Sequence, residues 1–140
     1  MHSDLRGILT SLQIVAEDNL RKQDGFTPFG FILFEGKNIQ SIARDNPVDG
    51  AKKDFEYLRE KLAEKAATSD FVAIGLCSMA QLKPKPGVPN SKALYAMLEH
   101  STGESVTAFL PFQKTGDGYA FEKEILRRAE PVFFKHKHSG

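Results

Sequence analysis

The sequence has a single cysteine, no tryptophan, no long apolar run and a net charge of only +1. One cysteine cannot form an intramolecular disulfide, so a small disulfide-rich secreted domain is excluded. The longest apolar runs, 29–34 and 71–77, fall far short of the ~20 residues that a membrane helix needs. The amino end lacks the charged and apolar segments of a signal peptide. We therefore expect a cytoplasmic protein without a membrane role.

The charge balance also argues against a nucleic-acid partner. The chain has 19 basic and 18 acidic residues, whereas proteins that bind a phosphate backbone usually carry a clear basic excess. Gly116-Asp117-Gly118 lacks the third glycine of a dinucleotide-binding loop, so it is interpreted as a turn. No cofactor is expected from any motif in the chain.

A chain of 140 residues with 41% hydrophobic and 26% charged residues is typical of one globular domain. We expect this domain to span residues 1–134 and the polar residues 135–140 to form a disordered tail. Apolar residues at spacings of three and four predict helices from Ser3 to about Gln23 and from about 51 to 66. Phe121, Ile125 and Ala129 predict a third, short helix.

Two segments rich in β-forming residues, Phe29–Phe34 and Ile39–Ala43, predict a first hairpin. Gly36 suits a type II′ turn that would place Phe34 opposite Ile39. The run 71–77 is apolar at odd and at even positions alike, as expected for a central strand covered on both faces. Residues 132–134 are interpreted as a last edge strand.

The segments 93–100 and 104–112 predict a second hairpin, whose register follows from the loop between them. A three-residue loop with Gly103 in the left-handed region avoids a positive φ at the β-branched Thr102. This register pairs His100 with Glu104 and places all the aliphatic side chains on one face. The other face carries Tyr95, Met97, Glu99, Ser105, Thr107 and Phe109.

The order of elements predicts an α+β single domain, with a five- or six-stranded, mainly antiparallel sheet, two long helices and one short helix. Helices on one face would leave the other face partly open. This order resembles roadblock, longin and profilin-like domains, and the resemblance implies a dimerising scaffold or adaptor. The motifs Phe26-Thr27-Pro28-Phe29-Gly30 and Leu98-Glu99-His100 resemble a small uncharacterised bacterial family, a resemblance that implies no activity.

Few residues suggest chemistry. Glu99 and His100 are neighbours on a strand, so their side chains point to opposite faces and cannot form a catalytic pair with each other. His100 and Glu104 are expected to form a modest surface ion pair across the hairpin end. Cys77 is interpreted as a small buried hydrophobe. His2, His136 and His138 lie near the chain ends, and no metal site is expected from their spacing.

These observations favour a non-catalytic interaction or adaptor module that self-associates as a homodimer or binds a protein partner. The expected contact surface is Tyr95, Met97 and Phe109, together with Lys83 and Lys85 in the proline-rich loop 83–89. Two alternatives remain open: a sensor that binds a small ligand, and a small enzyme that uses His100 and Glu99.

Overall fold

The computed structural model describes residues 1–23, 25–43, 50–81, 92–116 and 118–134. Within these ranges the chain forms an α+β domain with two helices, α1 (Ser3–Gln23) and α2 (Ala51–Ala66). Seven strands form one sheet: β1 (Phe29–Phe34), β2 (Ile39–Ala43), β3 (Phe71–Gln81), β4 (Lys92–His100), β5 (Ser105–Thr115), β6 (Gly118–Phe121) and β7 (Ile125–Arg128).

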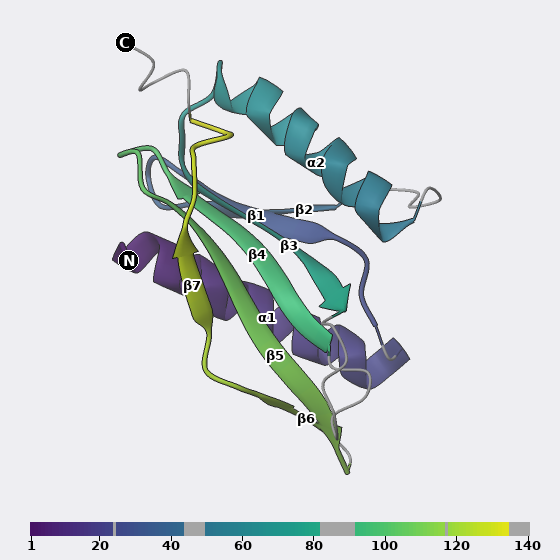
Figure 1. The fold of residues 1–140 in the computed structure, drawn as a ribbon. Helices are drawn as coiled ribbons and strands as arrows, with labels where there is room; N and C mark the ends of the chain where they lie inside the picture. Colours follow the sequence, from purple (N-terminus) through teal and green to yellow (C-terminus); the bar gives the residue numbers. More distant parts are fainter. Residues whose placement is uncertain (24, 44–49, 82–91, 117, 135–140) are drawn as a thin grey trace.

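The sheet is antiparallel in every described pairing, and its strand order is β2-β1-β3-β4-β5-β6, with β7 also paired to β5. β5 is long enough to hold β6 near its end and β7 near its beginning. Figure 1 shows the two helices on opposite faces of this sheet. The domain therefore has three layers, α1, sheet and α2.

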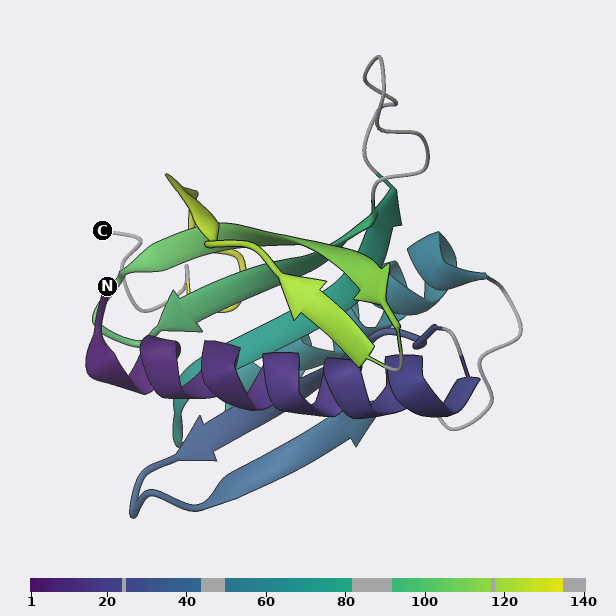
Figure 2. The same ribbon diagram turned by 90° about the horizontal axis from the view of Figure 1, so that it is seen from below.

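Helix α1 packs chiefly over β3 and β4, as Figure 2 shows from its side of the sheet. Its buried residues recur at helical spacing: Leu5, Ile8, Leu9, Leu12, Ala16 and Leu20. The strands beneath it present small side chains, among them Ala73, Ala96 and Ala108. Because these side chains are short, α1 packs close to the sheet, with Ile8 and Leu12 against Gly75.

On its α2 side the central strand β3 presents larger side chains than on its α1 side. Leu58 and Leu62 of α2 pack against Ile74 and Leu76 of β3. The segment after β7 lies on this same side and contributes Phe133 and Phe134, whose side chains are fully buried. Both faces of the central strands are therefore covered, which explains why 71–77 is apolar at odd and at even positions alike.

The predicted register of the second hairpin and the predicted central position of the strand at 71–77 are both confirmed. Leu98 lies opposite Val106 and Leu94 opposite Leu110, and the His100 N–H donates to the Glu104 carbonyl at 2.8 Å. Gly103 has a φ of 108°, which its lack of a side chain permits. β3 lies between β1 and β4, as expected for the most apolar strand.

The predicted short helix over Phe121, Ile125 and Ala129 is wrong, because this segment forms β6 and β7. Three apolar positions are a weak helical signal, and pairing along the long edge of β5 overrides it. The sheet therefore has seven strands in the described residues, rather than the expected five or six. Residues 132–134 are not an edge strand either, because their backbone leaves the sheet and lies over its α2 face.

The first hairpin forms, but its register differs from the prediction by one residue. Ile39 lies opposite Leu33 rather than Phe34, and the Phe34 N–H donates to the Asn38 carbonyl. Lys37 takes a φ of 66° beside Gly36 at 86°, so one more residue enters the turn. This turn sets which backbone groups of β2 face outward.

None of the helices in the described ranges is long and apolar enough to cross a membrane. The proposed tail, 135–140, lies outside the described residues.

Replacing Gly75 by alanine should destabilise the fold, because the new Cβ would collide with Ile8 and lie only 3.2 Å from Leu12 and 3.1 Å from Leu98. Overpacking of this kind usually costs about 1–3 kcal/mol. Gly7 is exposed in α1 and a Cβ there meets nothing within 4 Å, so Gly7→Ala should stabilise by about 0.5–1 kcal/mol. Urea unfolding of both variants tests the difference, and equal stabilities would contradict the close approach of α1 to β3.

Candidate functional site

The expected contact surface of Tyr95, Met97 and Phe109 faces α2 rather than open solvent. Met97 is only 9% exposed, and Tyr95 and Phe109 are half-buried. The Tyr95 ring lies 5.8 Å from Phe55 of α2 and 5.1 Å from Phe109, measured between ring centroids. The expectation of helices on one face only is thus wrong. A partner role for these three residues stays a prediction, and Lys83 and Lys85 lie outside the described residues.

An open hollow of about 420 Å³ lies between α2 and the end of β3, next to this aromatic group. Its lining mixes charged and apolar side chains: Lys52, Phe55, Glu56, Arg59, Ser78 and Met79. Burial raises the pKa of the Tyr95 hydroxyl, and the Arg59 charge opposes part of that rise. This hollow is where the small-ligand alternative would place its ligand, since its volume falls in the usual range for ligand pockets.

The edge strand β2 is an exposed strand without charged residues at one side of the sheet. Among the described residues β2 pairs only with β1. Four of its five residues are exposed, and Ile39 is 57% exposed. The strand contains no charged residue and no proline. Its outer edge therefore presents unpaired backbone groups beside an exposed apolar side chain.

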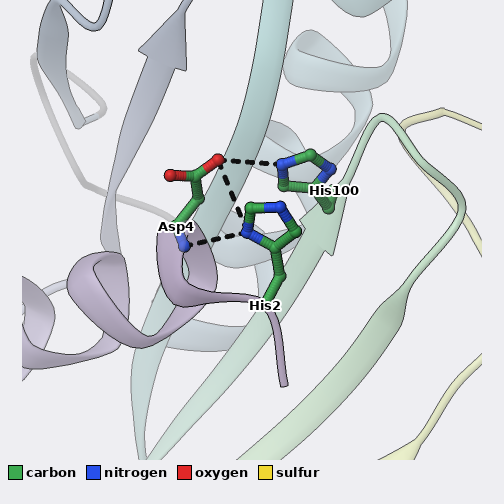
Figure 3. A group of neighbouring side chains, drawn as sticks. All are labelled: His2, Asp4 and His100. Carbon is green, nitrogen blue, oxygen red and sulfur yellow. Dashed lines mark hydrogen bonds and ion pairs between the residues drawn. The ribbon is translucent and has the colours of Figure 1, made fainter.

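A polar cluster joins the start of α1 to the end of β4 (Figure 3). Asp4 Oδ2 lies 3.0 Å from His100 Nε2 and 3.5 Å from His2 Nδ1. The rings of His2 and His100 stack with centroids 4.0 Å apart. The cluster forms because β4 alternation points His100 to the α1 face, where the first turn of α1 meets it.

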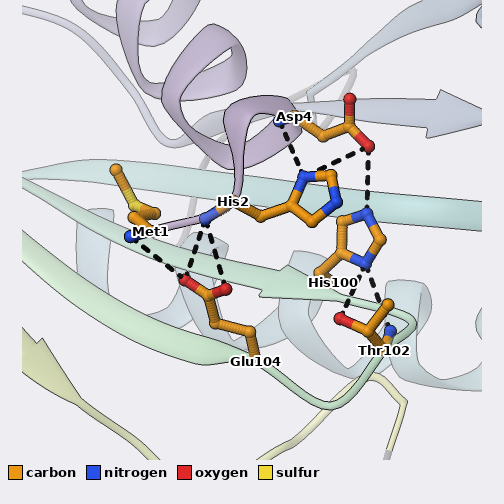
Figure 4. Close-up of polar contacts among 6 residues, drawn as sticks. All are labelled: Met1, His2, Asp4, His100, Thr102 and Glu104. Carbon is orange, nitrogen blue, oxygen red and sulfur yellow. Dashed lines mark hydrogen bonds and ion pairs between the residues drawn. The ribbon is translucent and has the colours of Figure 1, made fainter.

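The hydrogen bonds of the cluster fix the ring tautomers (Figure 4). The Thr102 N–H lies 3.2 Å from His100 Nδ1, which therefore accepts, so Nε2 of a neutral ring carries the proton and donates to Asp4. His2 Nδ1 accepts from the Asp4 N–H at 3.0 Å. Because both ring nitrogens of His100 are engaged, this geometry does not favour His100 as a general base.

The expected His100–Glu104 side-chain pair is replaced by two separate sets of contacts. His100 is 4% exposed and is held by Asp4 and Thr102. The Glu104 carboxylate instead accepts from the His2 backbone N–H at 3.1 and 3.2 Å, and lies 3.9 Å from the Met1 amino group. Only the backbone groups of His100 and Glu104 bond directly.

Glu99 is a buried carboxylate on the opposite face, 1% exposed. It accepts backbone N–H groups from Val132 at 2.9 and 3.0 Å, and from Phe133 and Phe134 at 2.8 Å each. These donors satisfy the carboxylate, as burial of a charge requires. Glu99 thus holds the segment after β7 against the sheet, and its oxygens are occupied by this structural task.

Sequence reasoning placed Glu99 and His100 on opposite faces, but did not find their partners. In the sequence His2 is a terminal residue, and Asp4 is an acidic residue in the first turn of a helix, so neither indicates a site by itself. Within the described ranges, His2, Asp4 and His100 are the three donors whose ligand atoms gather within 4.8 Å, as a metal site requires. Only the docking of α1 brings them together.

The comparisons with known proteins do not identify a relative of this chain. A scan against family models finds no match, and searches of curated proteins and of solved structures find no significant similarity. The resemblances to a small bacterial family and to roadblock or profilin-like domains stay predictions.

Glu99→Gln should destabilise the protein by about 1.5–3 kcal/mol, because it removes the charge and turns Oε2, which accepts from the Val132 N–H, into a donor that faces that N–H. Glu130→Gln, at an exposed position nearby, should change stability by less than about 0.5 kcal/mol. Urea unfolding measures both, and hydrogen exchange at Phe133 and Phe134 should quicken only in Glu99→Gln. Equal stabilities would show that the carboxylate does not hold this segment.

Cys77 should be almost inert in the native protein. Its side chain is fully buried, and burial raises the pKa of the thiol far above its usual range, although a backbone hydrogen bond at Phe29 opposes the rise. Because the thiolate is the reactive form, a disulfide reagent should label native protein no faster at pH 9 than global unfolding permits. In urea the labelling should be fast and should increase with pH. Rapid native labelling would contradict the buried position.

Proposed function

We propose that this protein is a non-catalytic interaction module that self-associates as a homodimer through the edge strand β2. The observation that carries the proposal is the uncharged, exposed edge of β2, with Ile39 57% exposed. Such an edge offers a row of unpaired N–H and C=O groups to a second strand.

The hydrogen-bond pattern of the first hairpin identifies the outward groups. Phe34 donates to Asn38, and hydrogen-bonded pairs alternate along an antiparallel ladder. Gly30–Ile42 and Ile32–Gln40 are therefore the bonded pairs within the hairpin. The N–H and C=O groups of Ile39, Ser41 and Ala43 consequently point away from β1, toward a new strand.

The other side of the sheet is less suited to pairing. β7 ends in Arg127 and Arg128, and charged side chains on an edge oppose pairing with another strand. β6 is only four residues long and mostly half-buried, with contacts to α1. β2 is the longer edge and has neither protection.

A second copy is the occupant that fits this edge best, because β2 is self-complementary. Two copies related by a two-fold axis at Ser41 would pair Ile39 with Ala43 of the other copy, and these residues share one face of the strand. The five residues of β2 carry no charge, so the paired strands themselves bring no two charges together. A five-residue edge buries little area, so we expect a weak dimer that depends on concentration.

Ile39→Lys should weaken the dimer at least about tenfold, which corresponds to ~1.4 kcal/mol, because it places a charge at the pairing edge. Ile125→Lys is the matched control: Ile125 is 51% exposed, close to the 57% of Ile39, but lies on β7. Sedimentation velocity over a range of protein concentrations measures both. Weakening by Ile125→Lys alone, or a wild-type chain that stays monomeric at every concentration, would overturn the proposal.

Ser41→Pro provides a second, backbone-directed test. It removes an N–H that points outward and leaves the bonded pairs with β1 in place, as proline on an edge strand allows. Ser41→Ala keeps the N–H and should dimerise like the wild type. Equal dimerisation of the two variants would show that β2 backbone groups are not the contact.

A further inference from the structure

We propose that His2, Asp4 and His100 bind a divalent transition-metal ion, with Zn²⁺ as the best fit. Two of the three side chains come from the start of α1 and the third from the end of β4, so the site exists only in the folded chain. Their ligand atoms lie within 4.8 Å of one another. None of the three residues belongs to β2, so the site does not rest on the proposed dimer contact.

Two of the three distances between ligand atoms are close to what a tetrahedral ion requires, and the third lies within 4.8 Å. With metal–ligand bonds of about 2.0–2.1 Å, neighbouring ligand atoms lie about 3.3 Å apart. Asp4 Oδ2 is 3.0 Å from His100 Nε2 and 3.5 Å from His2 Nδ1, values on either side of this spacing. The His2 side chain is 37% exposed, so its ring has room to turn from its stack on His100 toward the ion.

The hydrogen-bond partners of His100 support metal binding at Nε2. When an ion replaces the proton on Nε2, that proton must move to Nδ1, because the neutral ring keeps one. Thr102 Oγ1 lies 3.0 Å from Nδ1 and can accept it, in exchange for the bond that Nδ1 accepts from the Thr102 N–H in the metal-free protein. A ligating histidine usually donates its second ring N–H to such an acceptor. His2 Nδ1 would exchange its bond from the Asp4 N–H for the ion.

The donor set selects the class of metal. Two imidazoles and one carboxylate suit Zn²⁺ and similar ions, whereas Mg²⁺ and Ca²⁺ prefer oxygen ligands alone. The Asp4 and His2 side chains are 35% and 37% exposed, which leaves a route for the ion and for a water as fourth ligand. Glu104, held by the His2 N–H, adds negative charge nearby.

Metal binding would tie the first turn of α1 to the end of β4, between residues 96 positions apart in the chain. An ion that binds the folded chain and not the unfolded one raises the melting temperature as its concentration rises. We therefore expect Zn²⁺ to stabilise the protein in a concentration-dependent way.

The test is titration of the tag-free chain with Zn²⁺ alone, followed by calorimetry and by thermal unfolding. The four histidines form two pairs that can be separated, His2 with His100 and His136 with His138. We expect one ion per chain, a higher Tm, and at least ~10-fold weaker binding for His2→Ala and for Asp4→Asn. The double variant His136→Ala/His138→Ala is the matched control and should bind like the wild type.

Two results would overturn the proposal. One is loss of binding in the tail variant with retention in His2→Ala, which would assign the ion to the tail. The other is the absence of both binding heat and a Tm change in the wild type. Circular dichroism of His2→Ala and Asp4→Asn confirms that each is folded, and Co²⁺ absorption reports whether the wild-type site is tetrahedral.

Discussion

Burial of β3 and β4 on both faces is the constraint on which the rest of this structure depends. Strands that lie in the middle of a sheet between two helices must present apolar side chains at every position. The two faces of β3 meet this demand differently, with small residues such as Ala73 and Gly75 beneath α1 and large ones such as Ile74 and Leu76 toward α2.

The same constraint makes Glu99 and His100 the critical polar residues of β4. Both are buried at the strand end, and alternation sends them to opposite faces, so each needs partners from a different layer. Asp4 and Thr102 meet His100, and the backbone of 132–134 meets Glu99. The two ends of the described chain are thus docked by adjacent residues of one strand, one below the sheet and one above it (Figure 1).

The two helices lie over the central strands of the sheet and leave its edge strand β2 exposed. Among the described residues β2 pairs with one strand, β1, and four of its five residues are exposed. An exposed edge and a polar cluster at the chain start are the two features of this domain that its core does not explain. The first suits another strand and the second suits a cation, because each presents groups of the right kind that point outward or toward one another.

Local sequence determined the two long helices, both hairpins and the register of the second one, because helical spacing and the need for a positive φ at Gly103 act over a few residues. It also determined that the side chains of Glu99 and His100 point to opposite faces of the sheet, since the alternation of side chains along a strand is a local property. Tertiary structure alone decided that 118–128 would pair with β5 rather than form a helix, that α2 would cover Tyr95 and Met97, and that His2 and Asp4 would meet His100. These outcomes depend on contacts between segments far apart in the chain. A short sequence pattern does not contain the free energies of burial and strand pairing that decide between such alternatives.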